Sequence, residues 1–149
     1  MKLSKKAEYG MRAMVAMGRA AAGTTFSIQD LAANENIPLK FLEQILLVLK
    51  NAGLLRSKRG VGGGYQMQRP ANDVPLREIV EAIDGPFDPI GCVQGSRPGK
   101  SCECGIAGGC GLGRTMSELR DMVQTWLTET TVAHIIAREA PPQMMSFDI

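Results

Sequence analysis

The chain has 149 residues, 44% of them hydrophobic, and its 17 lysines and arginines against 15 acids give a formal net charge of +2. This composition excludes a disordered or fibrous protein and suffices for one hydrophobic core with a small appendage. No run approaches the roughly 18 apolar residues of a membrane span, and no secretion signal follows Met1, so we expect a cytoplasmic protein with no membrane partner.

The charge is distributed unevenly along the chain. Residues 1–70 contain eleven lysines and arginines against four acids, whereas residues 71–149 contain six against eleven. Such a positive excess makes the first half a candidate for polyanion binding, because basic side chains neutralise phosphates and release counterions. A solvated basic face is the alternative that charge alone leaves open.

The first fifty residues predict three helices. Apolar residues recur at helical spacing over residues 3–22, and Gly23 to Thr25 is expected to end that helix. Ser27 can cap a short helix over 28–34, and Pro38 can open another that runs to about residue 52. Two short helices joined by a tight turn are typical of a helix-turn-helix.

The helix after Pro38 has an apolar and a polar stripe. The apolar stripe is expected to be buried and comprises Phe41, Leu42, Ile45, Leu46 and Leu49. This leaves Lys40, Glu43 and Gln44 exposed near the start of the helix, where a recognition helix meets base edges in the major groove. Glu43 can either accept a hydrogen bond from a cytosine amine or repel phosphate.

A basic hairpin follows directly. Residues 54–59 and 65–68 predict two strands, joined by a glycine turn over 60–64. A helix-turn-helix followed by such a hairpin predicts a winged helix, with Arg59 in a minor groove and with Lys58 and Gly62 as further DNA-contacting residues. A dinucleotide-binding loop is disfavoured, because Tyr65 replaces its last glycine and no helix follows.

Four cysteines, Cys92, Cys102, Cys104 and Cys110, gather in a glycine-rich segment over residues 85–113 that follows a predicted helix over 76–83. Thiols used only for packing would be scattered, whereas clustered thiolates suit a metal, an iron-sulfur cluster or a redox switch. A reducing cytoplasm makes disulfides the less favoured use. Thiolates suit iron and zinc alike, so ligand type leaves both metals open.

The last part of the chain predicts two more helices. A heptad seam comprises Leu112, Met116, Leu119, Val123 and Trp126. It fits a helix that pairs with its twin or packs on the first helix of its own chain. Thr131 can cap a short final helix, on which His134 is expected to be a surface residue rather than a metal ligand.

The residues described so far resemble the Rrf2 family of small bacterial winged-helix regulators, of the IscR and NsrR type. The resemblance covers residues 1 to about 138, and its most specific parts are residues 1–4 with Tyr9, 37–49 around Leu42-Glu43-Gln44, 59–65, and 83–85. It implies a homodimer that binds palindromic promoter DNA and an iron-sulfur cluster that tunes the binding. A 2Fe-2S cluster is favoured over a 4Fe-4S cluster.

The ligand set implied by the resemblance has three cysteines, best matched by Cys92, Cys104 and Cys110, although Cys102 competes with Cys104 for the middle place. The fourth ligand is either Glu8 of the partner subunit, which occupies the matching position in the first helix, or Cys102. A regulator without cofactor, or with zinc or free thiols, that acts through a protein partner in cysteine metabolism is the alternative.

The expected architecture is mainly α with a small β-hairpin wing. It consists of a winged helix-turn-helix DNA-binding domain over 1–84, a cysteine-rich cluster-binding loop over 85–113, a dimerisation helix and terminal helix over 114–140, and a flexible tail over 141–149. No general base or nucleophile grouping is present, so we expect no enzyme.

Overall fold

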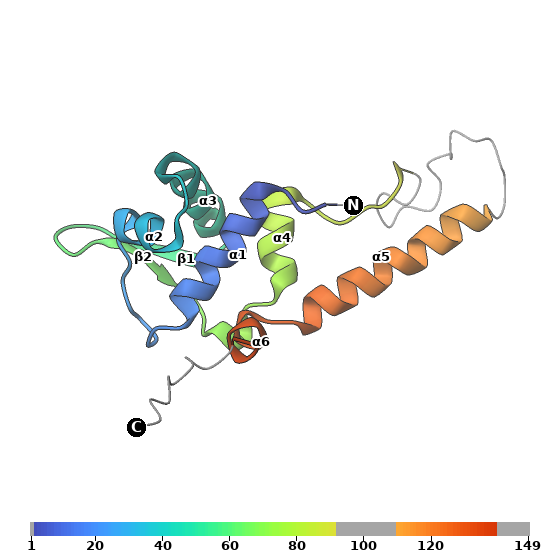
Figure 1. Cartoon of the computed structure of the whole chain (residues 1–149). Helices are drawn as coiled ribbons and strands as arrows, with labels where there is room; N and C mark the ends of the chain where they lie inside the picture. The colour runs from blue at the N-terminus through green and yellow to red at the C-terminus, as the bar shows by residue number, and fades with distance from the viewer. Residues whose placement is uncertain (1, 92–109, 140–149) are drawn as a thin grey trace, which may run out of the picture.

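The structure is a computed structural model that describes residues 2–91 and 110–139 (Figure 1). Its helices are α1 (Lys5–Gly18), α2 (Ile28–Glu35), α3 (Leu39–Asn51), the short 3₁₀ helix η1 (Ala71–Asp73), α4 (Leu76–Asp84), α5 (Gly111–Glu129) and α6 (Val132–Ala137). The strands β1 (Leu55–Lys58) and β2 (Gly64–Met67) form an antiparallel hairpin. The prediction of a mainly helical fold with a hairpin wing is confirmed, while the predicted tail over 141–149 lies outside the described residues.

Helix α1 is central and packs against α2, α3, α4 and α6. It begins at Ser4, whose side chain accepts a hydrogen bond from the Ala7 amide at 3.0 Å. Gly10 allows α4 to approach closely, because a Cβ atom there would lie 2.4 Å from the Ile83 Cδ1 atom. Helix α1 ends at Gly18, earlier than the predicted residue 22, and the chain then turns back so that Phe26 reaches β2.

The helix-turn-helix forms where it was predicted. Ser27 caps α2, and Asn36 ends it in the left-handed conformation, with a φ angle of 51°. Helix α3 then buries the predicted stripe of Leu42, Ile45, Leu46 and Leu49.

The prediction that Phe41 belongs to this buried stripe is wrong, because 46% of its surface is exposed. Residues 38–41 are all exposed, whereas Leu42 is fully buried. Val48, seven residues after Phe41 on the same side of α3, is also 38% exposed, so this side lies outside the buried stripe. Helical periodicity placed Phe41 at the edge of the stripe but carried no information on how far around α3 the neighbouring elements reach.

The hairpin is joined to the helical body through its second strand. Leu55 pairs with Met67 at the base, and Lys58 pairs with Gly64 near the turn. Phe26 and Tyr65 exchange two backbone hydrogen bonds of 2.9 Å, which fasten β2 to the segment before α2. The wing is therefore held at a fixed position beside the helix-turn-helix.

Helix α5 projects away from the body and packs against α4 (Figure 1). After it, the chain returns and pairs with the segment before α4: the Leu76 amide donates to the Thr130 carbonyl at 2.8 Å, and the Val132 amide donates to the Val74 carbonyl at 3.0 Å. Helix α6 then packs on α1 and η1. Over the described ranges, no helix has the length and apolar character that crossing a membrane requires.

Candidate nucleic-acid interface and cysteine site

The exposed face of α3 carries the predicted DNA-binding residues. Lys40 and Gln44 lie one above the other, four residues apart, and Glu43 lies beside them. All three are exposed, as predicted. Their donors and acceptors are therefore available to base edges or phosphates.

The wing presents a second group of polar and basic residues. Lys58, Arg59 and Gly62 are exposed at the end of the hairpin, and Arg56 on β1 donates to the Gln66 Oε1 atom at 2.9 Å. Figure 1 shows the hairpin turn at one end of the molecule and α5 at the other. Because α3 packs on β1, the wing and the α3 face come from neighbouring elements.

Cys110 is the one cysteine that falls within the described residues, and Cys92, Cys102 and Cys104 lie outside them. Its thiol is free, partly exposed and placed at the N-terminal end of α5. The Sγ atom accepts a weak hydrogen bond from the Gly113 amide at 3.5 Å. A thiol that is accessible and in no disulfide is a suitable soft ligand for iron or zinc.

Glu8 lies on the first turns of α1 with an exposed carboxylate. The Lys5 Nζ atom approaches its Oε2 atom to 2.7 Å, and this hydrogen bond lowers the pKa of Glu8 while it raises the pKa of Lys5. Glu8 is thus held ionised, in the form that can coordinate a metal. No three His, Cys, Asp or Glu side chains gather within 2–91 and 110–139, so these ranges contain no complete metal site.

Two contacts that the sequence did not predict connect α1 with other parts of the winged helix. Asp84, the last residue of α4, accepts hydrogen bonds from the Ser4 amide, at 2.9 Å, and from the Ser4 hydroxyl. Arg12, one turn after Glu8, donates to the backbone carbonyl of Glu35 at the end of α2. The partners are 80 and 23 residues apart, respectively, so no local pattern could have revealed them.

Helix α5 exposes much of its apolar surface. Leu112 and Trp126 of the predicted seam are 61% and 50% exposed, and none of the helix's residues is fully buried. Met122, which is not part of the predicted seam, is 70% exposed. Leu127 instead packs toward the core, so the helix turns one apolar side to its own chain and the other outward.

His134 lies exposed on α6, as predicted. Its Nδ1 atom accepts from the Thr131 amide at 3.0 Å, and the Thr131 hydroxyl accepts from the His134 amide, so that the two residues form a capping box. This role is structural and local to the start of α6.

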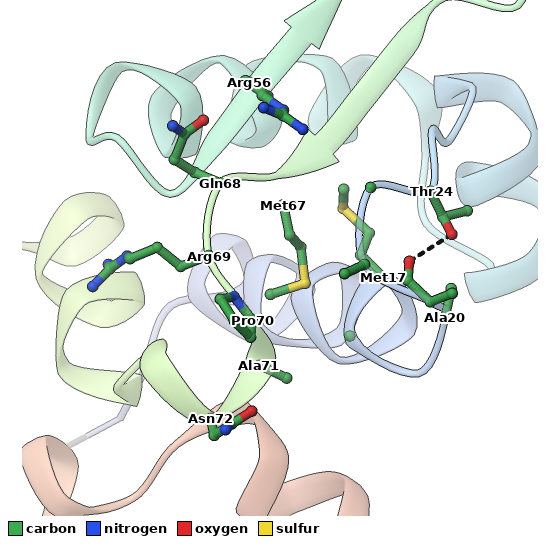
Figure 2. Close-up of a pocket in the computed structure, with 14 residues that line it drawn as sticks. Met17, Ala20, Thr24, Arg56, Met67, Gln68, Arg69, Pro70, Ala71 and Asn72 are labelled. Carbon is green, nitrogen blue, oxygen red and sulfur yellow. Dashed lines mark hydrogen bonds between the residues drawn. The ribbon is translucent and has the colours of Figure 1, made fainter.

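A hollow of about 330 Å³ lies between the end of α1, the base of the hairpin and η1 (Figure 2). Met17 and Met67 lie within it, and Arg56, Gln68 and Asn72 are at its border. None of the predicted DNA-binding residues or described cysteine ligands lines this hollow, so it is separate from both candidate sites.

Comparison with known proteins connects these features with one family. The family model Rrf2, described as an iron-dependent transcriptional regulator, matches residues 3–138. The regulator IscR of Cereibacter sphaeroides is 32% identical over 147 residues, which cover 95% of this chain and 91% of IscR. The Mycobacterium tuberculosis protein Rv1287, which carries the name of an HTH-type transcriptional regulator, is 45% identical over 87 residues. That match spans 58% of this chain and only 54% of Rv1287.

Solved structures show the same fold. CymR of Bacillus subtilis, titled a global cysteine regulator, superposes with a TM-score of 0.76 at 24% identity, over 94% of this chain and 99% of CymR. The T. potens IscR superposes with a TM-score of 0.72 at 22% identity, over 95% of this chain and 93% of that one. The curated relatives are named as transcriptional regulators and not as enzymes. The chain belongs to the Rrf2 family of transcriptional regulators.

Proposed function

We propose that the chain is a transcription regulator that binds promoter DNA as a homodimer in the cytoplasm and senses iron-sulfur cluster status, redox state or nitric oxide. The observation that carries the DNA-binding part is the exposed polar face of α3 beside a basic wing. In this arrangement Lys40, Glu43 and Gln44 enter the major groove. Lys58 and Gly62 lie along the sugar-phosphate backbone of the DNA, and Arg59 reaches into the adjacent minor groove.

Two substitutions test this interface. We expect Lys40→Ala and Arg59→Ala each to weaken operator binding by about 5- to 150-fold per half-site at fixed salt, because each removes from every half-site a charged contact worth about 1–3 kcal/mol. Each should also reduce the slope of log K against log salt by about one per half-site. Titration of a labelled duplex at several salt concentrations measures both quantities.

Arg138→Ala is the matched control, since it removes the same charge from an exposed residue that follows α6. It should leave affinity and salt slope close to those of the native protein. Native affinity in both interface variants would contradict the assignment of α3 and the wing to DNA.

The homodimer is proposed from the outward side of α5. A helix of 19 residues is about 28 Å long and here leaves Leu112, Met122 and Trp126 exposed. Large apolar side chains in a row rarely face water in a monomer. A second copy of α5 would cover them, and would hold two winged helices at the distance of two DNA half-sites.

The cofactor proposal begins with the donor set. The Cys110 thiol is accessible and in no disulfide, which fits a cluster ligand. Cys92 and Cys104 would complete the set of three, and either Glu8 of the partner subunit or Cys102 would be the fourth ligand. When bound, a cluster, as 2Fe-2S in preference to 4Fe-4S, supplies a centre whose state depends on oxidants or nitric oxide.

The contacts of α1 support a route from the cysteine segment to the DNA-binding face. Asp84, the residue before this segment, accepts a hydrogen bond from Ser4 and so joins the end of α4 to the N-terminal end of α1. Arg12 of the same helix holds the turn between α2 and α3 through the Glu35 carbonyl. A change in the position of α1 would therefore reach the recognition helix, and a coupling of about 1–3 kcal/mol would change DNA affinity about 5- to 150-fold.

Iron and sulfide content test the cofactor. We expect protein purified without oxygen to be coloured and to contain both, and Cys110→Ser to lose most of them, because a serine oxygen replaces a soft thiolate. His134→Ala, which removes a side chain engaged in capping, should keep the native iron content. Comparing Glu8→Gln with Cys102→Ser identifies the fourth ligand as the one whose loss lowers iron content.

A second candidate function is a regulator without an iron-sulfur cluster, either cofactor-free or using zinc or free thiols, that acts through a protein partner. It is supported by the similarity to CymR, titled a global cysteine regulator. The same purification separates the two candidates. Colourless, iron-free protein that binds its operator equally before and after reconstitution would exclude the cluster and favour this second function.

A further inference from the structure

Helix α3 exposes an aromatic ring beside the polar residues of the candidate interface. Phe41 is 46% exposed, on the first turn of the helix, directly after Lys40. An exposed benzyl side chain has no hydrogen-bonding group and loses the free energy that burial would give it. A surface that comes to cover it would restore that free energy.

The position of Phe41 on the helix selects it among the exposed apolar residues of α3. Phe41 lies three residues before Gln44, so both side chains project from the same face. Leu39 projects from the other side of the helix, and Leu47 and Val48 lie in later turns. A recognition helix contacts base edges chiefly through its N-terminal residues, which favours Phe41 over Leu47 and Val48.

The chemistry of the major groove offers one group that matches this ring. Base edges there present donors and acceptors, and the apolar exception is the C5-methyl group of thymine. A benzyl ring cannot neutralise a phosphate or read a donor, but it packs well on a methyl group. Gln44 on the same face is suited to the N6 and N7 atoms of adenine.

We propose that Phe41 is a specificity-determining residue that packs on a thymine methyl in each half-site, beside an adenine read by Gln44. This inference rests on the proposed function, namely that α3 enters the major groove. It adds a requirement for thymine at one position, which charge and hydrogen bonding alone would not impose.

Replacing thymine by deoxyuridine tests the proposal, because the replacement removes the methyl group and leaves base pairing intact. The operator is first selected from a random duplex pool with the full-length protein, and each thymine is then replaced singly. For the native protein, we expect one position in each half-site to lose about fourfold in affinity per methyl removed. Replacement of any other thymine should leave the affinity unchanged.

Phe41→Ala should bind the thymine operator more weakly than the native protein does. The loss of affinity that deoxyuridine causes at that position, which we call the uracil penalty, should disappear in this variant. Phe41→Leu should keep part of the penalty, since leucine is also apolar. Lys40→Ala is the control: it should weaken binding to the thymine and uracil duplexes by the same factor and so preserve their ratio. Circular dichroism checks that the variants fold, which a side chain this exposed should allow.

Two outcomes would overturn the inference. A Phe41→Ala protein that keeps the full uracil penalty, or a native protein that shows none, removes the methyl contact. If the native protein shows none and Phe41→Ala weakens binding to the thymine and uracil duplexes equally, the ring is assigned to sugar packing instead. If Lys40 and Arg59 still matter in these cases, the proposed function survives, whereas failure to enrich any duplex overturns both.

Discussion

Replacing Trp126 with aspartate is expected to convert the proposed dimer into a monomer and to weaken binding to a duplex with two half-sites by about 10²- to 10⁴-fold. Trp126 is half exposed on the outward side of α5, near Met122. Buried tryptophans contribute strongly to interfaces, and an unpaired carboxylate in their place would be desolvated at high cost. A monomer would also lose the gain in affinity that comes from linking two binding modules.

The matched control is Thr128→Asp, which introduces the same charge at another exposed residue, two positions later and on the opposite side of the helix. Light scattering gives the mass of each protein, and titration with one-half-site and two-half-site duplexes gives the affinities. The Trp126→Asp protein should keep its native affinity for the single half-site. A Trp126→Asp protein that remains a dimer would show that α5 does not form the interface.

Gly64→Ala is expected to destabilise the protein by about 3–5 kcal/mol and to release the wing. The φ angle of Gly64 is +154°, and a Cβ atom there would lie 2.0 Å from the Phe26 carbonyl oxygen. That oxygen accepts one of the two hydrogen bonds between Phe26 and Tyr65. Relief of the clash would break this pairing, at about 1 kcal/mol for each hydrogen bond, in addition to about 1–3 kcal/mol of backbone strain.

Gly62→Ala distinguishes the destabilisation caused by backbone strain from the destabilisation caused by a steric clash. The φ angle of Gly62 is also positive, at +71°, but a Cβ atom there meets nothing within 4 Å. We expect a loss of only about 1–2 kcal/mol. Urea unfolding of both variants measures the difference, and similar losses would show that the contact with Phe26 does not fasten the wing.

The helices of this fold could largely be predicted because their determinants are local. Ser27 and Thr131 each cap the helix expected to follow them, and the buried stripe of α3 follows the helical period. The predictions are wrong where the structure of a segment depends on a neighbouring element. Phe41 is exposed because the neighbouring elements do not reach around to its side of α3, and α1 stops early because the chain must return to pair Phe26 with Tyr65.

The candidate sites also contain features that depend on local sequence and features that depend on tertiary packing. The residues on the exposed side of α3 could be identified from the sequence, because a helical period that buries one face exposes the other. The hydrogen bonds from Ser4 to Asp84 and from Arg12 to the Glu35 carbonyl depend on how α1 meets α4 and α2. Contacts made by tertiary packing leave no periodic pattern in the sequence.

The backbone pairing at Leu76 and Val132 has a consequence for how this architecture can vary. Because the segments before α4 and after α5 are paired, residues 76 to 130 form a closed loop, of which α4 packs on α1 and α3, and α5 packs on α4. The entropy of closing such a loop rises by only about 0.6 kcal/mol for each doubling of its length. Insertions between α4 and α5 should therefore cost little stability, and different cysteine spacings can be carried by an unaltered winged helix.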